Sequence, residues 1–231
     1  MFGLEGMKRE KVLKLELLEP HDGGGRQLKN KIWHPRHAEI TWSSRLTESF
    51  HLSYLKSGEA RDVFAVDSFP MVLKIQRGVF HNNSNAREAA IAEGDLRCCT
   101  ATVYGCVRCD WGEEQVSVLV MERLPWDFRA YASLWFGRHP GPETIHPLLL
   151  SIGSFFRVLR VLAVDLRYCV RDCHWGNVGV SYAHDVVMLD FDAFEHDPCN
   201  LAKRADKCNR GGNQFVQSLK ACVKNMSAEH P

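Results

Sequence analysis

Three side chains in the C-terminal half carry oxygen atoms that could bind a cation and orient a hydroxyl group. Asp172 and Asn177 lie five positions apart, and Asp190 follows 13 residues after Asn177. Magnesium prefers oxygen ligands and is usually held by a few protein groups together with phosphates, so one amide and one carboxylate suit it. The Asp172 carboxylate could accept a proton from an attacking hydroxyl group, or orient that group.

A β-hairpin is predicted to bring Asn177 and Asp190 together. The segments 178–182 and 186–191 predict two short strands, and a tight turn at 183–185 joins them. Asn177 enters the first strand and Asp190 leaves the second, so their oxygens can meet at one metal ion. Alternatively, the two aspartates could each cap the backbone at the end of a helix or a strand. The full constellation at this spacing favours the functional interpretation.

The remaining sequence predicts strands first and helices afterwards. Residues 1–40 contain one alternating segment, 13–17, followed by three glycines, so we expect an extension ahead of the main domain. Strands are predicted at 51–54, 63–67, 71–76, 102–109 and 115–121, with a helix over 84–96. Further helices are predicted at 128–136, at 143–167 and at about 213–224. This order is typical of an α+β protein with two unequal lobes.

The segment that runs from Arg171 to Asn177 resembles a motif of the protein-kinase-like superfamily. Arg171-Asp172 with Asn177 resembles the kinase catalytic loop, and Asp190-Phe191 resembles the magnesium-binding motif of the family. The form Asp-x-His-x-Gly-Asn is more similar to the atypical branch, which includes aminoglycoside- and choline-kinase-like enzymes. The resemblance runs from about residue 52 to residue 194.

The resemblance implies a two-lobed kinase-like fold that binds ATP and Mg²⁺ in the cleft between its lobes. The β-rich N-lobe would span 41–124, and the mostly helical, shortened C-lobe would span 125–231. Asp172 would be the catalytic aspartate, and Asn177 and Asp190 would be the metal ligands. The reaction would move the γ-phosphoryl group of Mg-ATP to a hydroxyl acceptor, either a protein or a small molecule.

The resemblance also assigns phosphate-binding roles in the β-rich part. Lys74, within the apolar strand 72–75, resembles the strand lysine that reaches the α- and β-phosphates. Glu88 resembles the helix glutamate that holds this lysine, with Glu93 as the alternative. Gly58 is the one glycine left where the family has a glycine-rich loop, and its turn could point backbone N–H groups at phosphate. An ordinary hairpin turn is the alternative for Gly58.

The apolar segment 118–124 resembles the strand and hinge behind the adenine ring. Carried over, the Glu122 carbonyl and the Leu124 amide would contact the edge of the base, and Met121 would lie at the back of the pocket. An apolar strand that ends in a charged pair is common. The position of this segment between Lys74 and Asp172 is therefore the stronger argument.

Some positions depart from the family pattern. Val170 stands where eukaryotic protein kinases usually carry histidine, and Asp192 replaces the glycine after Asp190-Phe191. His174 could neutralise charge on the transferred group or orient the loop by a hydrogen bond. Only 39 residues follow Asp192, so we expect the part that binds protein substrates in typical kinases to be curtailed. The alternative function is a pseudokinase, a nucleotide-binding or scaffolding module without turnover.

Composition excludes several function classes. The net charge is +1 and 45% of the residues are apolar, so we expect a packed core and neither a nucleic-acid nor a membrane partner. The apolar stretch 147–170 contains four charged residues and is expected to be a buried or half-buried helix. Nine cysteines in a chain of this size predict reduced thiols and a cytoplasmic protein. Zinc held by Cys106 and Cys109, with Cys98 and Cys99 nearby, is the alternative.

Overall fold

The computed structural model describes residues 13–18, 37–42, 46–58, 61–77, 84–111, 114–136 and 142–229. The chain divides into two compact units. The first comprises Met1–Ala90 and Thr102–Arg123, and the second comprises Ile91–Ala101 and Leu124–Pro231. A large sheet makes up most of the first unit, and most helices lie in the second. The predicted α+β class is therefore confirmed.

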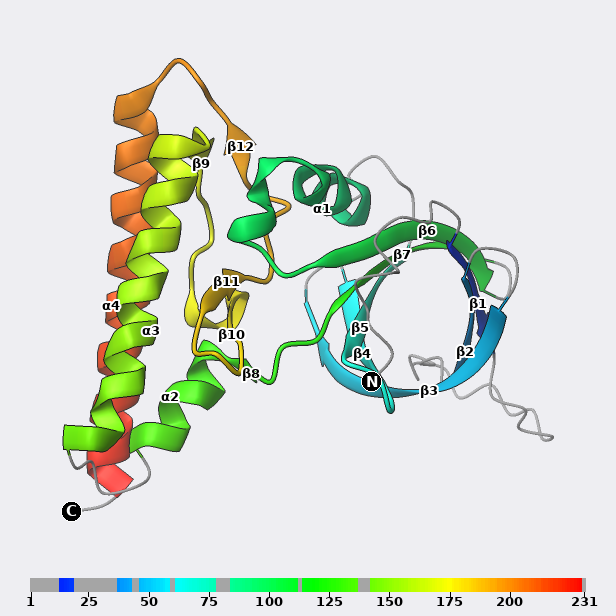
Figure 1. Cartoon of the computed structure of the whole chain (residues 1–231), viewed down its shortest axis with the longest axis horizontal. Helices are drawn as coiled ribbons and strands as arrows, with labels where there is room; N and C mark the ends of the chain where they lie inside the picture. Colours follow the sequence, from blue (N-terminus) through cyan, green and yellow to red (C-terminus); the bar gives the residue numbers. More distant parts are fainter. Residues whose placement is uncertain are drawn as a thin grey trace. The chain divides into compact units, whose positions relative to one another are not determined.

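The first unit contains a seven-stranded antiparallel sheet in the order β1-β2-β3-β4-β5-β7-β6. Its strands are β1 (Leu13–Leu18), β2 (His37–Trp42), β3 (Leu46–Ser57), β4 (Arg61–Val66), β5 (Met71–Arg77), β6 (Val103–Trp111) and β7 (Glu114–Glu122). The sheet curls until β1 lies beside β6, as the ring of strands in Figure 1 shows. All the strands predicted from residue 51 to residue 121 are present.

The core of this unit lies inside the curled sheet. Side chains alternate between the two faces of a strand, and one face of each strand supplies apolar residues such as Phe64, Leu73, Ile75 and Val118. The outer face of β2 and β3 is polar, as the hydrogen bond between the Thr41 and Thr47 hydroxyl groups illustrates. Lys74 lies between Leu73 and Ile75, so it faces away from this core.

Helix α1 (Ser84–Glu93) begins in the first unit and packs on the outer face of the sheet. Asn85, Glu88 and Ala89 are buried at the i, i+3, i+4 spacing that defines one helix face. The Asn85 Nδ2 atom donates to the Lys74 carbonyl at 2.8 Å and to the Ser117 carbonyl at 2.7 Å. These two bonds tie the helix to β5 and β7.

The predicted N-terminal extension does not lie apart from the sheet where it is described. β1 pairs with β2 along its whole length, and β2 pairs with β3. The predicted domain start at residue 41 therefore falls within a strand, and β1 and β2 belong to the first unit. The predicted boundary at residue 124 lies next to Arg123, where the first unit ends, although residues 91–101 group with the second unit.

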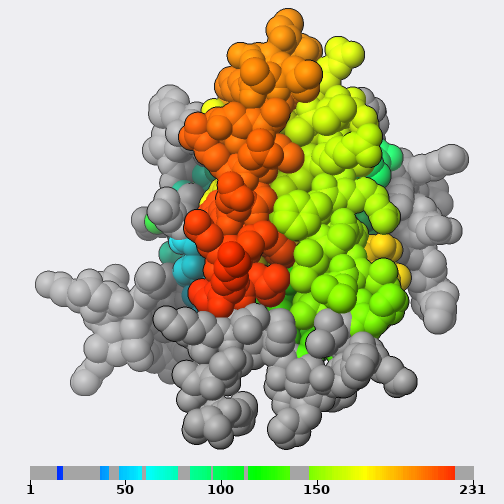
Figure 2. All heavy atoms as spheres, turned by 90° about the vertical axis from the view of Figure 1, so that its left-hand side faces the viewer, coloured from blue at the N-terminus to red at the C-terminus, as the bar shows by residue number. Residues whose placement is uncertain are grey.

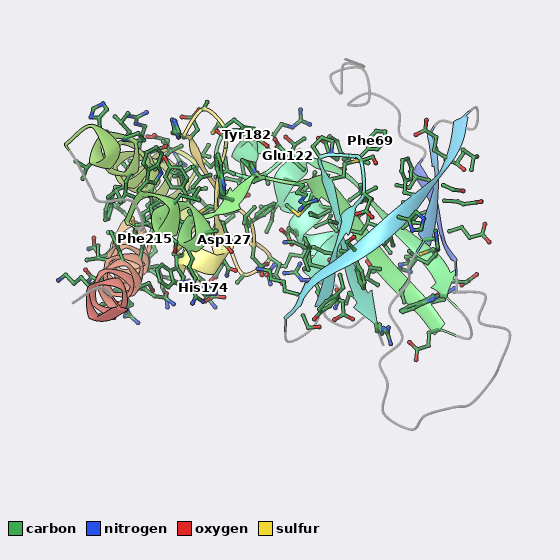
Figure 3. All side chains as sticks on the ribbon, turned by 90° about the horizontal axis from the view of Figure 1, so that it is seen from below. Phe69, Glu122, Asp127, His174, Tyr182 and Phe215 are labelled. Atoms are coloured by element: carbon green, nitrogen blue, oxygen red, sulfur yellow. The ribbon has the colours of Figure 1, made fainter. Side chains whose placement is uncertain are left out.

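The second unit is built around three helices and a π-helical turn. These are α2 (Phe128–Phe136), α3 (Pro142–Arg160), η4 (Val161–Asp165) and α4 (Leu201–Glu229). Figure 2 shows α3 and α4 side by side along one face. The ring of Phe215, which is labelled in Figure 3, stacks on Phe155 with centroids 3.8 Å apart and meets Phe128 edge to face at 4.7 Å.

Short strands and turns connect the helices of this unit. They are η3 (Asp95–Cys98), β8 (Trp126–Asp127), β9 (Tyr168–Cys169), η5 (Trp175–Asn177), β10 (Val178–Val180), β11 (Val186–Met188) and β12 (Glu195–His196). β10 and β11 form an antiparallel pair in which Val178 lies opposite Met188. The predicted hairpin after Asn177 is thus confirmed.

The last helix begins earlier than predicted. The sequence places its start just after Gly211-Gly212, whereas α4 begins at Leu201, and the Asn200 side chain accepts the Lys203 N–H at 2.9 Å. Both glycines lie where the helix closely approaches its neighbours. A Cβ atom at Gly211 would come within 3.1 Å of the Cys173 sulfur, and one at Gly212 within 3.1 Å of the Phe156 ring. The glycines serve packing and do not interrupt the helix.

The apolar stretch in α3 and η4 is half-buried, as predicted. Leu148, Phe155 and Leu159 are buried, whereas Leu149 and Phe156 are exposed. Among the described residues, His146–Asp165 is the one stretch whose length and composition would allow a membrane span, and 39% of its most apolar window is buried inside the protein.

Candidate functional site

Lys74 and Glu88, which the sequence analysis pairs, lie in contact. The Lys74 Nζ atom is 2.7 Å from Glu88 Oε1, and their side chains are 9% and 0% exposed. Lys74 points toward α1 because its strand neighbours face the core, and Glu88 lies on the buried face of that helix. Glu93, the alternative partner, is exposed. The first unit therefore holds an ammonium group in a fixed position with a buried carboxylate.

Arg61 joins this pair, and the sequence analysis missed it. The Arg61 Nη1 atom is 2.5 Å from Glu88 Oε2, and the arginine side chain is 9% exposed. Arg61 and Val63 share one face of β4, and Val63 lies opposite Lys74 in the sheet. Alternation along β4 puts Arg61 on the face of Val63, but only the register between β4 and β5 puts that face beside Lys74, so no local sequence signal identifies Arg61. Two cations thus share the two oxygens of one carboxylate.

The Gly58 turn uses its own amide to close a hairpin. The Gly58 N–H donates to the Arg61 carbonyl at 2.7 Å. A Cβ atom added at Gly58 would meet that carbonyl at 3.6 Å, which is an ordinary contact distance. The Gly58 N–H is therefore committed within the turn, and residues 59–60 lie outside the described residues.

The predicted hinge segment ends β7 and leads out of it. Met121 is buried and lies opposite Val72, on the same sheet face as Lys74 and Leu119. Glu122, which is labelled in Figure 3, exchanges bonds with Thr102: its N–H donates to the Thr102 carbonyl at 2.8 Å, and its carboxylate accepts the Thr102 N–H at 3.2 Å. Leu124 belongs to the second unit.

The Leu124 side chain packs against Gly179, the glycine in the middle of β10. A Cβ atom added at Gly179 would collide with the Leu124 methyl group and would lie 3.0 Å from Leu189. Gly179 pairs with Asp127 of β8, so the strand has no room for a larger residue at this position. This packing fixes the chain that follows Leu124 against the hairpin.

The loop before β10 holds Asp172 in an unusual conformation. Asp172 has a φ of 54°, in the left-handed region that non-glycine residues seldom adopt. The Asn177 Nδ2 atom donates to both the Asp172 carbonyl and its Oδ2 atom at 3.1 Å. Asn177 is buried, whereas the Asp172 side chain is 58% exposed. The loop therefore presents a carboxylate outward from a fixed backbone.

His174 supports the same loop. Its Nδ1 atom accepts the Gly176 N–H at 3.1 Å, and its Nε2 atom lies 3.8 Å from Asp172 Oδ1 (His174 is labelled in Figure 3). Since Nδ1 accepts a hydrogen bond, the neutral imidazole carries its proton on Nε2, facing Asp172. The bond to Gly176 is compatible with the orienting role, one of the two roles expected for His174.

The hairpin places Asn177 next to the residue before Asp190. The Leu189 N–H donates to the Asn177 carbonyl at 2.9 Å. The Asn177 amide nitrogen donates to Asp172, and its Oδ1 atom is the only amide atom that can act as a cation ligand. An amide oxygen and a carboxylate are ligand types that magnesium prefers, and the hairpin carries one near each of its ends.

The cysteines do not form the alternative zinc site. Cys106 and Cys109 lie three residues apart on β6 and so point to opposite faces: Cys106 meets the Ser117 hydroxyl at 3.7 Å, and Cys109 packs on the core. Burial raises the pKa of the Cys109 thiol to about 11. Across the described residues, no group of three or more His, Cys, Asp or Glu side chains is arranged to hold a metal ion.

Burial also makes Cys173, within the Asp172 loop, an unreactive thiol. It raises the pKa of Cys173 to about 12, so the group is protonated near neutral pH. Cys173 packs on Gly211 of α4 instead. On the other side of Asp172, Arg171 pairs with Glu195 of β12 at 2.8 Å. The loop is thus anchored on both sides of the aspartate.

No protein-family model matches the chain, and no curated protein matches it. Two groups of residues are therefore the candidates for a functional site. One is the buried cluster of Arg61, Lys74 and Glu88. The other is the loop and hairpin that carry Asp172, Asn177 and Asp190.

Proposed function

We propose that the protein is an ATP-dependent phosphotransferase with a two-lobed, protein-kinase-like fold. It would transfer the γ-phosphoryl group of Mg-ATP to a hydroxyl group on a protein or a small molecule. The observation that carries the proposal is the 2.7 Å ion pair between Lys74 on β5 and Glu88 on α1. In protein kinases a strand lysine held by a helix glutamate must be in place for catalysis.

In this proposal the first unit binds the nucleotide. Lys74 contacts the phosphates, and Glu88 fixes its position. Val72, Leu119 and Met121 lie on the same sheet face as Lys74, and Val72, which is partly exposed, would offer the apolar contact for the adenine ring. The Glu122 carbonyl and the Leu124 amide would contact the edge of the base. Since ATP is an intracellular substrate, the protein would act in the cytoplasm.

The second unit would supply the cation site and the group that orients the acceptor. Asn177 Oδ1 and the Asp190 carboxylate would hold Mg²⁺, which neutralises charge on the phosphates when bound. Asp172 would accept the proton of the acceptor hydroxyl or orient it, because its carboxylate is exposed while its backbone is held by Asn177. Catalysis would then come from positioning and charge stabilisation.

A pseudokinase is the second candidate, and a specific observation favours it. The Gly58 N–H closes its own hairpin and does not offer a phosphate contact. A protein of this kind would bind nucleotide through Lys74 but would not turn it over.

A comparison of ATP hydrolysis by the wild-type chain and by Asp190→Ala tests the proposal. With Mg²⁺ present, we expect slow hydrolysis that falls by about a hundredfold or more in the variant, because one ligand of the cation is lost. Asp185→Ala is the matched control, since Asp185 is an exposed aspartate in the turn of the same hairpin. The control should keep the wild-type rate.

The other outcomes separate the alternatives. If ATP raises the melting temperature but no turnover is found, the pseudokinase is correct. If ATP neither raises the melting temperature nor is hydrolysed, the protein is not a nucleotide-binding protein and the proposal is wrong.

A further inference from the structure

We propose that Arg61 is a second phosphate-binding side chain, which takes over the contact that backbone amides make in a glycine-rich turn. This inference rests on the proposed nucleotide site and narrows its ligand to a nucleotide with two or more phosphates. It concerns the first unit alone, because the cluster and the turn both lie within it.

The geometry of the cluster is the first argument. Lys74 Nζ and Arg61 Nη1 contact the two different oxygens of the Glu88 carboxylate, at 2.7 and 2.5 Å. Their strands are neighbours in the sheet, and Val63 opposite Lys74 puts both cations on one face. Any phosphate group that reaches Lys74 on this face therefore comes close to the Arg61 side chain.

The chemistry of the guanidinium group is the second argument. It has five N–H donors in a planar fork, so it can hold a carboxylate along one edge and a phosphate along another. Arginine binds phosphate oxygens in a bidentate manner, whereas lysine acts as a point charge. Glu88 would then orient the Lys74 ammonium group and the Arg61 guanidinium group toward a polyphosphate.

The turn beside Arg61 is the third argument. The Gly58 N–H donates to the carbonyl of Arg61 itself, so the bond that removes this amide from ligand binding also fixes the backbone of the arginine. A Cβ atom at Gly58 would lie 3.6 Å from its nearest neighbour, which is an ordinary contact. A glycine is therefore not needed at this position to let a phosphate approach the backbone. The cationic side chain at the end of the turn is better placed for that role than the glycine.

The test measures the affinities of the full chain for ATP, ADP and adenosine by titration calorimetry, for wild type and Arg61→Met. We expect the dissociation constant for ATP to rise about tenfold, since one charge-assisted contact is lost, and that for adenosine to stay unchanged. Arg61→Lys should give an intermediate loss for ATP. Arg108→Met, which removes an exposed arginine from β6 of the same unit, is the matched control and should bind ATP as wild type does.

Each outcome decides between the inference and the proposed function. Equal ATP affinity of Arg61→Met and wild type overturns the inference and leaves the proposed function intact. An equal loss for ATP and adenosine also overturns it, because the role is then not specific to phosphate. If wild type itself binds no ATP, the proposed function fails and the inference fails with it. Should Arg61→Met not fold, the ATP-to-adenosine affinity ratio of Arg61→Lys decides: a lowered ratio supports the inference, and an unchanged ratio overturns it.

Discussion

The two candidate regions hold their carboxylates in opposite ways. Glu88 is 0% exposed and lies between two cations that are each 9% exposed, whereas the Asp172 side chain is 58% exposed in its loop. Burying an ion pair carries a large desolvation cost, which is offset only when the pairing is complete. An exposed carboxylate has no such cost, but Asp172 has a left-handed backbone with a φ of 54°.

Under the proposed function, this difference separates the residues that would bind the nucleotide from the residue that would act on the acceptor. The charges of the buried cluster are paired only in the folded protein. Replacing one of them should therefore first lower the free energy of unfolding. In the exposed loop the carboxylate can be changed with little effect on the fold, and the strain lies in the backbone. Residues that hold non-optimal backbone angles without a packing reason are often functional.

The largest difference in stability between the two regions is expected when the carboxylate of each is replaced by its amide. Glu88→Gln leaves two buried cations with a neutral partner and should lower the free energy of unfolding by about 3 kcal/mol. Asp172→Asn should change it by less than about 0.5 kcal/mol, because the side chain is exposed and asparagine tolerates the left-handed region. Chemical denaturation of both variants checks the comparison. Glu114→Gln, an exposed glutamate on β7 of the first unit, serves as the control.

Equal losses in the two amide variants would break the comparison. They would show that Glu88 is not the buried partner of two cations, or that Asp172 is not free to change. A loss in the Glu114 control as large as that of Glu88 would show that any charge change in the sheet destabilises the first unit.

A smaller effect on stability is expected from the left-handed backbone of Asp172. Asp172→Ala and Asp172→Gly both remove the carboxylate, and both should abolish phosphotransfer under the proposed function. Glycine adopts a φ of 54° without a Cβ penalty, so Asp172→Gly should be more stable than Asp172→Ala by about 1 kcal/mol. Thermal unfolding of the pair measures this difference. If alanine is as stable as glycine, the backbone conformation of Asp172 carries no strain.

Local patterns were sufficient to predict the elements that carry the two regions. Lys74 was placed on a strand by its apolar neighbours, and Asn177 and Asp190 were placed at the two ends of a hairpin by the turn between them. Those features depend on residues within about 15 positions of each other in the sequence. Lys74 and Glu88 lie 14 positions apart, but their pairing was predicted from the resemblance and not from periodicity.

Contacts between distant segments were not predictable in the same way. Arg61 reaches Glu88 across 27 positions, and only the register of β4 and β5 shows that both cations share a face. The packing of Gly211 on Cys173 shows why a glycine pair sits inside α4, and no local rule for helix ends contains that information. β1 and β2 belong to the sheet through pairings that a glycine-rich stretch in the sequence concealed.

The smallest effect concerns the partly exposed ions that follow the loop. Lys203 on α4 contacts Glu195 at 3.2 Å and Asp197 at 3.0 Å. Its hydrogen bonds lower the pKa of Glu195 and that of Asp197, and they raise the pKa of Lys203. The stabilisation is therefore present above the ordinary carboxyl values of 4.5 and 3.8, and is lost as the pH falls through the lower folded-state values. It is lost again when the pH rises through the raised value of Lys203.

Lys203→Met should accordingly lower the melting temperature at pH 7 by less than about 2 °C, because exposed ion pairs contribute little. The difference from wild type should shrink as the pH falls through the lowered pKa values of Glu195 and Asp197, because both carboxyl groups become protonated there. Lys220→Met, a change at an exposed lysine farther along α4, is the control and should show no such pH dependence. A loss at pH 7 as large as that of Glu88→Gln, or one that persists once both carboxyl groups are protonated, would mean that exposure does not separate weak ion pairs from strong ones in this protein.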